Sequence, residues 1–597
     1  MKLSRLLLIS AVAISLTSCD DLFEPALENN QDISEMYKNP EFARGILDNA
    51  YLALPYSTSP STDVATDDAV TNDNSDNYKK MATGSWAANM NPVSQWDGRY
   101  HAIQYCNLML ENCDKVQWAY SSEVLNKMYA DNYKGNAYAL RGLHMFYLLR
   151  AHAGMVDGQL MGVPIHLASE TSASDFNLPR NTFKECIDQI MSDFDEALKY
   201  LPEQYGDVAE ENVPAKYAQK GATNAEYNRA FGTNHRGKID GRIISAFKAQ
   251  VAIMAASPAY ASAGVFTYED AAKLAADCLK NFGGLSACDP DGWKWFDNKS
   301  LIDGLGATAD NPKEIIWRGN IDENNSLETE NYPSTLYGKG RVNPTQNLVD
   351  AFPMANGYPI TDTNSGYNAN DPYADRDPRL KAYILVNGDK IGSTDGVVNS
   401  AADSKTTDGL NKENGKSTKT GYYLRKLLRS DINLNPNSTT KQKHLNARIR
   451  STEILLDYAE AANEAQGPKA NVGGANYSAY DVIKAIRERA GIGEFGEDPY
   501  LEECAQSKEK MRELIRNERR LELCFENHRF WDLRRWKANL NEAAKGINIT
   551  TDEATGAFVY KTFEAEERKY DDYMFYGPIP YSEILKYSNL KQNEGWK

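Results

Sequence analysis

The segment spanning residues 517–536, NERRLELCFENHRFWDLRRW, holds four acidic residues, five arginines, one histidine and two tryptophans. Such a density of charge is typical either of an active site or of a buried network of ion pairs. Leu521, His528 and Trp531 follow one another at spacings of seven and three residues, which places them on one face of a helix. The spacing therefore predicts one packed amphipathic helix through the whole segment.

The charged residues of this segment are spaced so that they can pair with one another. Glu526 can reach Arg529, and Asp532 can reach Arg535, because residues three apart are neighbours on a helix surface. We interpret His528 as a core histidine, since a catalytic base needs an activated group beside it and access to solvent. Dense arginines beside acids and tryptophans favour buried ion pairs with stacked guanidinium planes. The structural signature consists of Glu518, Arg519, Arg520, Glu522, Glu526, His528, Arg529, Trp531, Asp532, Arg535 and Trp536.

The composition of the 597-residue chain is that of a soluble globular protein. Hydrophobic residues at 42% and charged residues at 25% are ordinary for a soluble globular protein with a large core. The formal net charge of −17 argues against a general binder of nucleic acid or of anionic membranes. We therefore expect no nucleic-acid partner.

The N-terminus has the pattern of a bacterial lipoprotein signal. Two basic residues precede an apolar run at residues 6–16, and Thr17 and Ser18 lead directly to Cys19. This pattern predicts that residues 1–18 are removed and that Cys19 is lipidated, which anchors a protein to a membrane without a spanning helix. An ordinary signal peptide followed by a chance cysteine is the alternative.

Helical periodicity dominates two parts of the chain. Apolar residues recur every three or four positions in residues 138–150, 181–201, 239–256, 269–284 and 451–465. The pairing of such segments by short turns, with alanines for close approach, predicts a mainly α fold of tetratricopeptide-like helix pairs. We divide the mature chain into helical regions at 19–284 and 447–597, and we expect them to fold as one unit with the stretch between them.

The middle stretch, residues 285–446, has a different character. It is rich in Asn, Asp, Gly, Tyr and Pro, which is turn chemistry, and residues 314–321 (EIIWRGNI) form its clearest predicted strand. Irregular stretches of this length are usually functional or disordered, and the aromatic content argues against disorder. We predict a large loop-rich insertion that carries the ligand surface.

Motifs for cofactors, metals and catalysis are weak. GTNHRGK at residues 232–238 lacks the Ser or Thr of a phosphate-binding loop and has no strand before it. No two of the seven histidines lie three or four positions apart, and the acidic loops at 72–76 and 371–377 lack the glycine and terminal glutamate of a calcium loop. We predict no cofactor and no metal. A carboxylate pair for glycoside hydrolysis is set by geometry, so the sequence leaves it open.

Residues 517–536, which we call the signature segment, resemble the C-terminal motif of the SusD/RagB family. The members of this family are nutrient-binding lipoproteins of the Bacteroidetes outer membrane. Further stretches resemble the same family in order along the chain: LTSC, DDLFEP, DNAYLAL, SWAANMNPVSQWDGRYHAIQYCNLMLE, ALRGLHMFYLLRAHAG, GVPI, NPTQNLVDAFPMANGYPI, DRDPRL, YGPIPYSEI and NLKQNEGW. The resemblance implies about four tetratricopeptide-like helix pairs with an irregular ligand-binding surface on one side. It also implies a cell-surface, lipid-anchored protein of the outer membrane, whose partner is a SusC-like TonB-dependent transporter.

The resemblance implies capture of an oligosaccharide or polysaccharide and its delivery to that transporter, without covalent chemistry. Two alternatives remain: oligopeptide import, as in RagB-like members, and a surface glycoside hydrolase. The family's starch-binding prototype grips glucan with an arc of aromatics, and the corresponding loop at residues 55–81 has no tryptophan here, which disfavours starch. Sugars need flat rings for stacking and polar groups for their hydroxyls. Our ligand-binding candidates are Asp67, Asp68, Asn77, Tyr78, Asn331, Tyr332, Tyr337 and Arg341, together with Trp86, for which a framework role is the stronger expectation.

Overall fold

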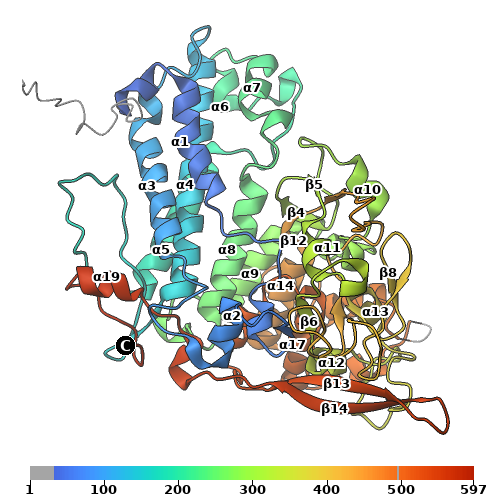
Figure 1. The fold of residues 1–597 in the computed structure, drawn as a ribbon. Helices are drawn as coiled ribbons and strands as arrows, with labels where there is room; N and C mark the ends of the chain where they lie inside the picture. Colours follow the sequence, from blue (N-terminus) through green and yellow to red (C-terminus); the bar gives the residue numbers. More distant parts are fainter. Residues whose placement is uncertain (1–32, 494–495) are drawn as a thin grey trace, which may run out of the picture.

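The computed structural model describes residues 33–493 and 496–597. Figure 1 shows a half built of long helices beside a half built of loops, short helices and short strands. The long helices are α1 (Pro40–Leu52), α3 (Trp96–Asn112), α4 (Glu123–His152), α5 (Phe183–Tyr200), α8 (Gly241–Ala256), α9 (Tyr268–Lys280), α14 (Ser451–Gln466), α15 (Ala479–Arg489) and α17 (Lys508–Leu523). Helices that follow one another pack side by side, α3 on α4, α4 on α5, and α8 on α9, and α14 covers α9. The predicted mainly α fold of tetratricopeptide-like pairs is confirmed.

The pairing of α4 with α5 shows how the sequence builds this scaffold. Thr182 and Glu185 form a reciprocal capping box that begins α5, so the helix cap is Thr182. The side chains of Ile187 and Phe194 are buried, and burying each contributes about 1.5–3 kcal/mol. On α4, a Cβ at Gly142 would lie 3.0 Å from the Phe194 ring. Glycine lets the two helices approach closely here, because any larger residue would push its neighbours aside by a few tenths of an ångström.

The loop-rich half contains short helices and paired strands. The short helices are α2 (Asn77–Lys80), α6 (Ala215–Ala218), α7 (Asn224–Phe231), α10 (Lys299–Gly304), α11 (Ser326–Asn331), α12 (Gln346–Ala351), α13 (Pro378–Tyr383), α16 (Pro499–Cys504), α18 (Arg529–Arg535) and α19 (Tyr581–Lys586), of which α6, α7 and α19 lie beside the long helices. The strands pair two at a time and antiparallel: β1 (Ala69–Thr71) with β6 (Val342–Pro344), β2 (Gly154–Val156) with β3 (Gln159–Met161), β4 (Ile315–Arg318) with β12 (Ala447–Arg450), β5 (Asp322–Asn324) with β11 (Gln442–His444), β7 (Ile384–Leu385) with β10 (Tyr423–Leu424), β8 (Lys390–Ile391) with β9 (Gly396–Val397), and β13 (Ala544–Thr551) with β14 (Phe558–Glu566). The predicted strand within residues 314–321 is confirmed as β4.

Two expectations for the C-terminal region need correction. The region 447–597 is not helical throughout, because β13 and β14 form a long hairpin that extends along one edge of the molecule (Figure 1). The signature segment is two helices rather than one: α17 ends at Leu523 and α18 begins at Arg529. Between them, Phe525 and Asn527 have φ of 63° and 64°, which a continuous helix cannot contain.

The cause of this break lies far away in the sequence. The Asp63 carboxylate accepts hydrogen bonds from the backbone amides of Phe525 and Asn527, each at 3.0 Å. The Asn527 side chain in turn accepts a bond from the Thr62 amide at 2.9 Å. These bonds satisfy amides that would otherwise be buried without partners. Helix periodicity carries no information about them.

Among residues 33–493 and 496–597, no helix combines the length and the hydropathy needed to cross a bilayer. The predicted lipidation site, Cys19, lies outside the described residues. The seven cysteines of the described part of the chain are free thiols.

Candidate functional site

The structure brings together the two loops from which the ligand candidates were taken. Strand β1 follows Asp68 and pairs with β6, which follows Arg341, with Thr71 opposite Val342. The Asn72 side chain donates to the carbonyls of Lys339 and Gly340, both at 2.9 Å. The two loops are therefore one surface, although half of the candidate side chains on them are buried.

The candidates Asp67 and Asp68 are internal ion-pair partners, which corrects their assignment to the ligand. Asp67 contacts Arg529 and Arg520, both at 2.9 Å, and Asp68 contacts Arg520 at 2.6 Å. Burial raises the pKa of Asp67, but the two guanidinium groups outweigh it and hold this pKa below its usual value. Both carboxylates thus connect the early loop to the signature segment.

Three further candidates also have structural roles. Asn331 is buried and holds the Leu327 carbonyl and the Val342 amide. Tyr332 is buried, and its hydroxyl donates to the Arg429 carbonyl. Trp86 packs against Trp596 at 4.9 Å between ring centroids, in agreement with the framework role expected for it.

The remaining candidates reach the surface or a pocket. Tyr337 is 56% exposed, with φ of 66°, and Asn77 is exposed at the start of α2. Arg341 is partly exposed and is held by Asn72 at 3.1 Å and by the Gly415 carbonyl at 3.2 Å. Tyr78 is half-buried and lines the large pocket described below.

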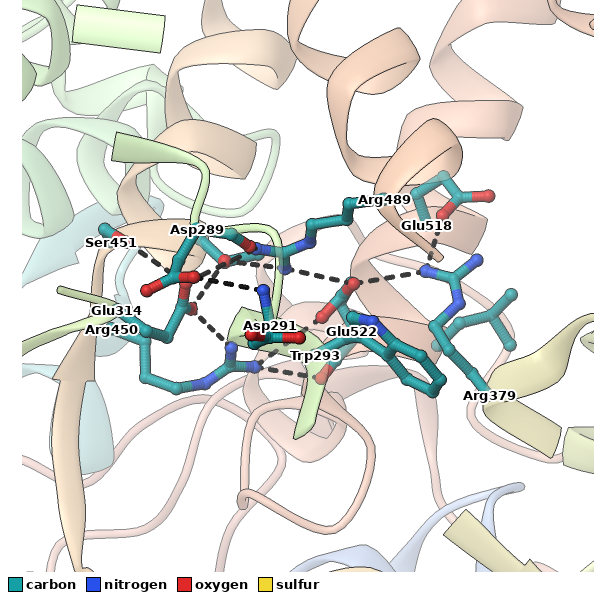
Figure 2. Close-up of polar contacts among 12 residues, drawn as sticks. Asp289, Asp291, Trp293, Glu314, Arg379, Arg450, Ser451, Arg489, Glu518 and Glu522 are labelled. Atoms are coloured by element: carbon teal, nitrogen blue, oxygen red, sulfur yellow. Dashed lines mark hydrogen bonds and ion pairs between the residues drawn. The ribbon is translucent and has the colours of Figure 1, made fainter. Parts of the chain in front are cut away.

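The charges of the signature segment are paired, as predicted, but most of their partners come from other parts of the chain and not from the segment itself. Figure 2 shows Glu522 between Arg489, at 3.1 Å, and Arg379, at 3.3 Å. Glu518 pairs with Arg379 at 2.9 Å and with Arg487 at 2.8 Å. Almost no surface of these side chains is exposed, so the network is internal to the protein.

Of the two ion pairs predicted within the segment, one is confirmed and one is wrong. Asp532 does pair with Arg535, at 2.8 Å. Glu526 instead contacts Arg450 at 2.8 Å and Lys426 at 2.7 Å, because the turn points it away from Arg529.

The turn between α17 and α18 forms one wall of a pocket of about 210 Å³. The pocket lies between the two halves of the molecule. Most of its lining comes from the loop after α1, the end of α4, the middle of α8, β12 with the start of α14, and residues 526–535, and Tyr78, Val93, Gln95, Tyr260 and Arg519 complete it. Representative lining residues are Tyr56, Arg150, Gln250, Arg448, Glu453 and Trp531. Each of these except Glu453 keeps part of its side chain exposed, so the pocket is open to solvent.

Aromatic rings and guanidinium groups alternate along this pocket. We call this arrangement the arginine–aromatic row: Trp531, Arg150, Tyr147, Tyr56 and Arg448 line the pocket, and the buried Trp317, which does not line it, continues the row. The Arg150 guanidinium lies 4.3 Å from the Trp531 ring and 4.8 Å from that of Tyr147. Tyr147 donates a hydrogen bond to Tyr56 at 2.9 Å. The Arg448 guanidinium lies 5.1 Å from the Tyr56 ring and 4.6 Å from that of Trp317.

The titratable groups of the pocket differ in charge state. His528 lies 3.7 Å from Glu453, and Gln250 donates to Glu453 at 2.8 Å. Burial, followed by repulsion from Asp457, raises the pKa of Glu453 to about 8. Burial, followed by repulsion from Arg519, lowers the pKa of His528 to about 3. Both side chains are therefore mainly neutral at pH 7. The interpretation of His528 as a core histidine needs correction, because it faces this pocket.

No local sequence pattern indicates this site. Arg150 ends a predicted helix, and Arg448 lies beside a predicted loop, 298 positions further along the chain. Only folding places their side chains on either side of Tyr56 and Tyr147. An internal aromatic and polar pocket carried on a rigid helical scaffold is typical of a protein that binds a small molecule or an oligomeric ligand.

Comparison with known proteins identifies the family. A model described as "SusD family" matches residues 313–596, and one described as "Starch-binding associating with outer membrane" matches residues 27–225. The chain belongs to the SusD/RagB family. SusD-like protein P2 of Formosa agariphila is 30% identical over 145 residues, which is 24% of this chain and 24% of that relative. The alignment thus spans about a quarter of that curated relative's length.

Solved structures share the fold over nearly the whole chain. A SusD-like protein from Bacteroides fragilis has a TM-score of 0.70 at 22% identity, covering 96% of this chain and 100% of that one. A SusD-like carbohydrate-binding protein from the same species has a TM-score of 0.66 at 20% identity, covering 93% of this chain and 100% of the other.

Proposed function

We propose that this protein binds a glycan in the pocket between its two halves and delivers it to a SusC-like TonB-dependent transporter of the outer membrane. The observation that carries the proposal is the arginine–aromatic row, of which Trp531, Arg150, Tyr56 and Arg448 are partly exposed, beside polar side chains. Flat rings such as those of Tyr56 and Trp531 stack on the C–H faces of sugars, while amide and guanidinium groups orient hydroxyls. Glycan binding in the SusD/RagB family, and by the carbohydrate-binding neighbour from Bacteroides fragilis, supports it.

The carboxylates in the pocket favour binding over hydrolysis. Glycoside hydrolysis needs one acid to donate a proton and a second, free carboxylate as base or nucleophile. Glu453 is mainly protonated at pH 7, but Asp457, Glu526 and Asp532 each contact an arginine within 2.8 Å. We infer that this protein captures its ligand without altering it.

Binding can be tested with the purified chain starting at residue 20. We expect saturable binding of at least one oligosaccharide by calorimetry, no binding of short peptides, and no release of reducing ends. Binding of peptides alone would favour the oligopeptide alternative, and release of reducing ends would favour the hydrolase.

The location and the partner form a second part of the proposal. We expect the Cys19→Ala variant to lose acylation and to leave the membrane fraction. We also expect a TonB-dependent barrel to copurify with the native protein in mild detergent. If the Cys19→Ala variant stayed in the membrane fraction, the predicted lipid anchor would be contradicted. If no barrel copurified with the native protein, the predicted delivery to a transporter would be contradicted.

A further inference from the structure

Resting on the proposed function, we propose that the glycan bound by this pocket carries anionic groups, and that Arg150 and Arg448 each bind one of them. The shared chemistry is that of a sugar carboxylate or a sugar sulfate. A neutral glycan could stack on the same rings, so the proposal depends on the state of the two guanidinium groups.

Arg150 and Arg448 differ from the other three arginines of the pocket. Arg450, Arg519 and Arg535 each contact a carboxylate at 2.5–2.8 Å. Within residues 33–493 and 496–597, no carboxylate lies within 4.0 Å of either Arg150 or Arg448. Among the described residues, neither side chain makes a hydrogen bond; the Arg150 Nε is buried, so the terminal nitrogens of its guanidinium group are the donors that a ligand could reach. The pocket therefore holds two cations whose donors are free for a ligand.

A guanidinium group without a counter-ion is costly when it is removed from water. Burial lowers the pKa of Arg150 and of Arg448 from the usual value, which is the effect of desolvation without a paired carboxylate. The flanking rings offset part of this cost through cation–π contact. They also hold each planar fork in place, which suits it to bind a carboxylate or sulfate through two donors.

The charge of the pocket also favours an anionic ligand. Its lining contains five arginines against four acids, Glu453, Asp457, Glu526 and Asp532, whereas the whole chain carries −17. Arg450, Arg519 and Arg535 are each neutralised by a carboxylate, and two of these, Glu314 and Glu460, lie outside the lining. Glu453, the acid that interacts electrostatically with Arg150, is mainly protonated at pH 7, so the positive charges without a paired carboxylate are those of Arg150 and Arg448. His528 is mainly neutral. This pocket is a positively charged site in an acidic protein, and such a site attracts anions.

The first experiment uses the unmodified protein on an array of neutral, uronate-containing and sulfated oligosaccharides. Each bound glycan is then tested again after carboxyl reduction or desulfation. We expect binding of acidic glycans, at least tenfold weaker binding after neutralisation, and weaker binding as salt is raised. Binding of neutral glycans, or binding unchanged by neutralisation, would overturn this inference and leave the proposed function intact. Binding of peptides alone would overturn both.

The second experiment locates the anion site. Arg150→Gln and Arg448→Gln should each weaken binding of the acidic glycan by about 10- to 100-fold, as expected for loss of a charge-assisted hydrogen bond. Arg44→Gln removes the same charge from the exposed face of α1 and should leave affinity within about twofold. Thermal unfolding checks that each variant is folded. Folded Arg150→Gln and Arg448→Gln variants with unchanged affinity would contradict the assignment.

Discussion

At the residue scale, the arginines and acids of the signature segment are at the energetic centre of the fold. Glu522 has no exposed surface and is surrounded by Arg379, Arg489 and Arg450, with Lys426 close by. Burial alone would raise its pKa, but these four cations lower it below the usual value. The carboxylate is therefore ionised and serves as a fixed counter-ion for three chain segments.

Removing one member of this network should destabilise the protein strongly. In Glu518→Ala, Arg379 and Arg487 each lose one charged partner while remaining buried, although Asp377 and Asp498 still pair with them. A buried donor left without its partner costs about 1–3 kcal/mol, and two donors are affected here. Denaturant unfolding should show this loss, while the fraction that still folds should keep its ligand affinity. Glu509→Ala, on the exposed first turn of the same helix, is the control and should change stability by less than about 0.5 kcal/mol. Normal stability with lost affinity would contradict the structural role of Glu518.

At the scale of the element, the helices and their interruption have different origins. The helical segments were predictable because capping residues and apolar periodicity are local, as in α5 and α9. The break between α17 and α18 was not predictable, because the Asp63 carboxylate that holds its amides lies 462 and 464 positions away. The polar periodicity of the segment continues through the turn, so the pattern alone predicts a single helix.

Contacts between helices also make stability depend on pH. His144 of α4 is buried, and its Nε2 lies 2.9 Å from the Ala50 carbonyl of α1. Burial, and then repulsion from Arg99, lowers its pKa from 6.5 to about 3. A lowered pKa means that the unfolded state binds the proton first. The stability owed to neutral His144 is thus complete above pH 6.5 and is lost as the pH falls towards 3.

The His144→Gln variant isolates this contribution, because glutamine can still donate to the Ala50 carbonyl but does not titrate. The stability difference between the unmodified protein and the variant should shift by about 1.4 kcal/mol, against the unmodified protein, between pH 7.5 and pH 5.5. Urea unfolding at the two pH values measures it. A difference that is independent of pH would show that His144 has no depressed pKa.

At the scale of the whole molecule, the fold was predictable and the site was not. Helical periodicity and the order of the family's motifs are spread along the chain, so they predict the scaffold. The pocket exists only because Tyr56, Arg150, Gln250, Arg448 and Trp531 come from five separate segments. Several candidates chosen from polar and aromatic loops, such as Asp67 and Tyr332, have buried side chains instead.

One tryptophan variant and one tyrosine variant test whether the ligand binds in the pocket or on the loop surface. Trp531→Ala removes a ring from the pocket wall, and we expect affinity for the bound glycan to fall by about 30-fold, as for other central aromatic contacts. Tyr337→Ala on the loop surface should change affinity by no more than about twofold. Tyr120→Ala, which is 77% exposed, serves as the control for a surface ring. Loss of binding in Tyr337→Ala alone would place the ligand on the loops.

The most direct test of a glycan site between the two halves is a crystal structure with a bound oligosaccharide identified on the array. We predict sugar density in the pocket, with a ring against Tyr56 or Trp531 and polar groups of the ligand facing Arg150 and Arg448. Density confined to the loops around Tyr337 and Arg341, with an empty pocket, would contradict it.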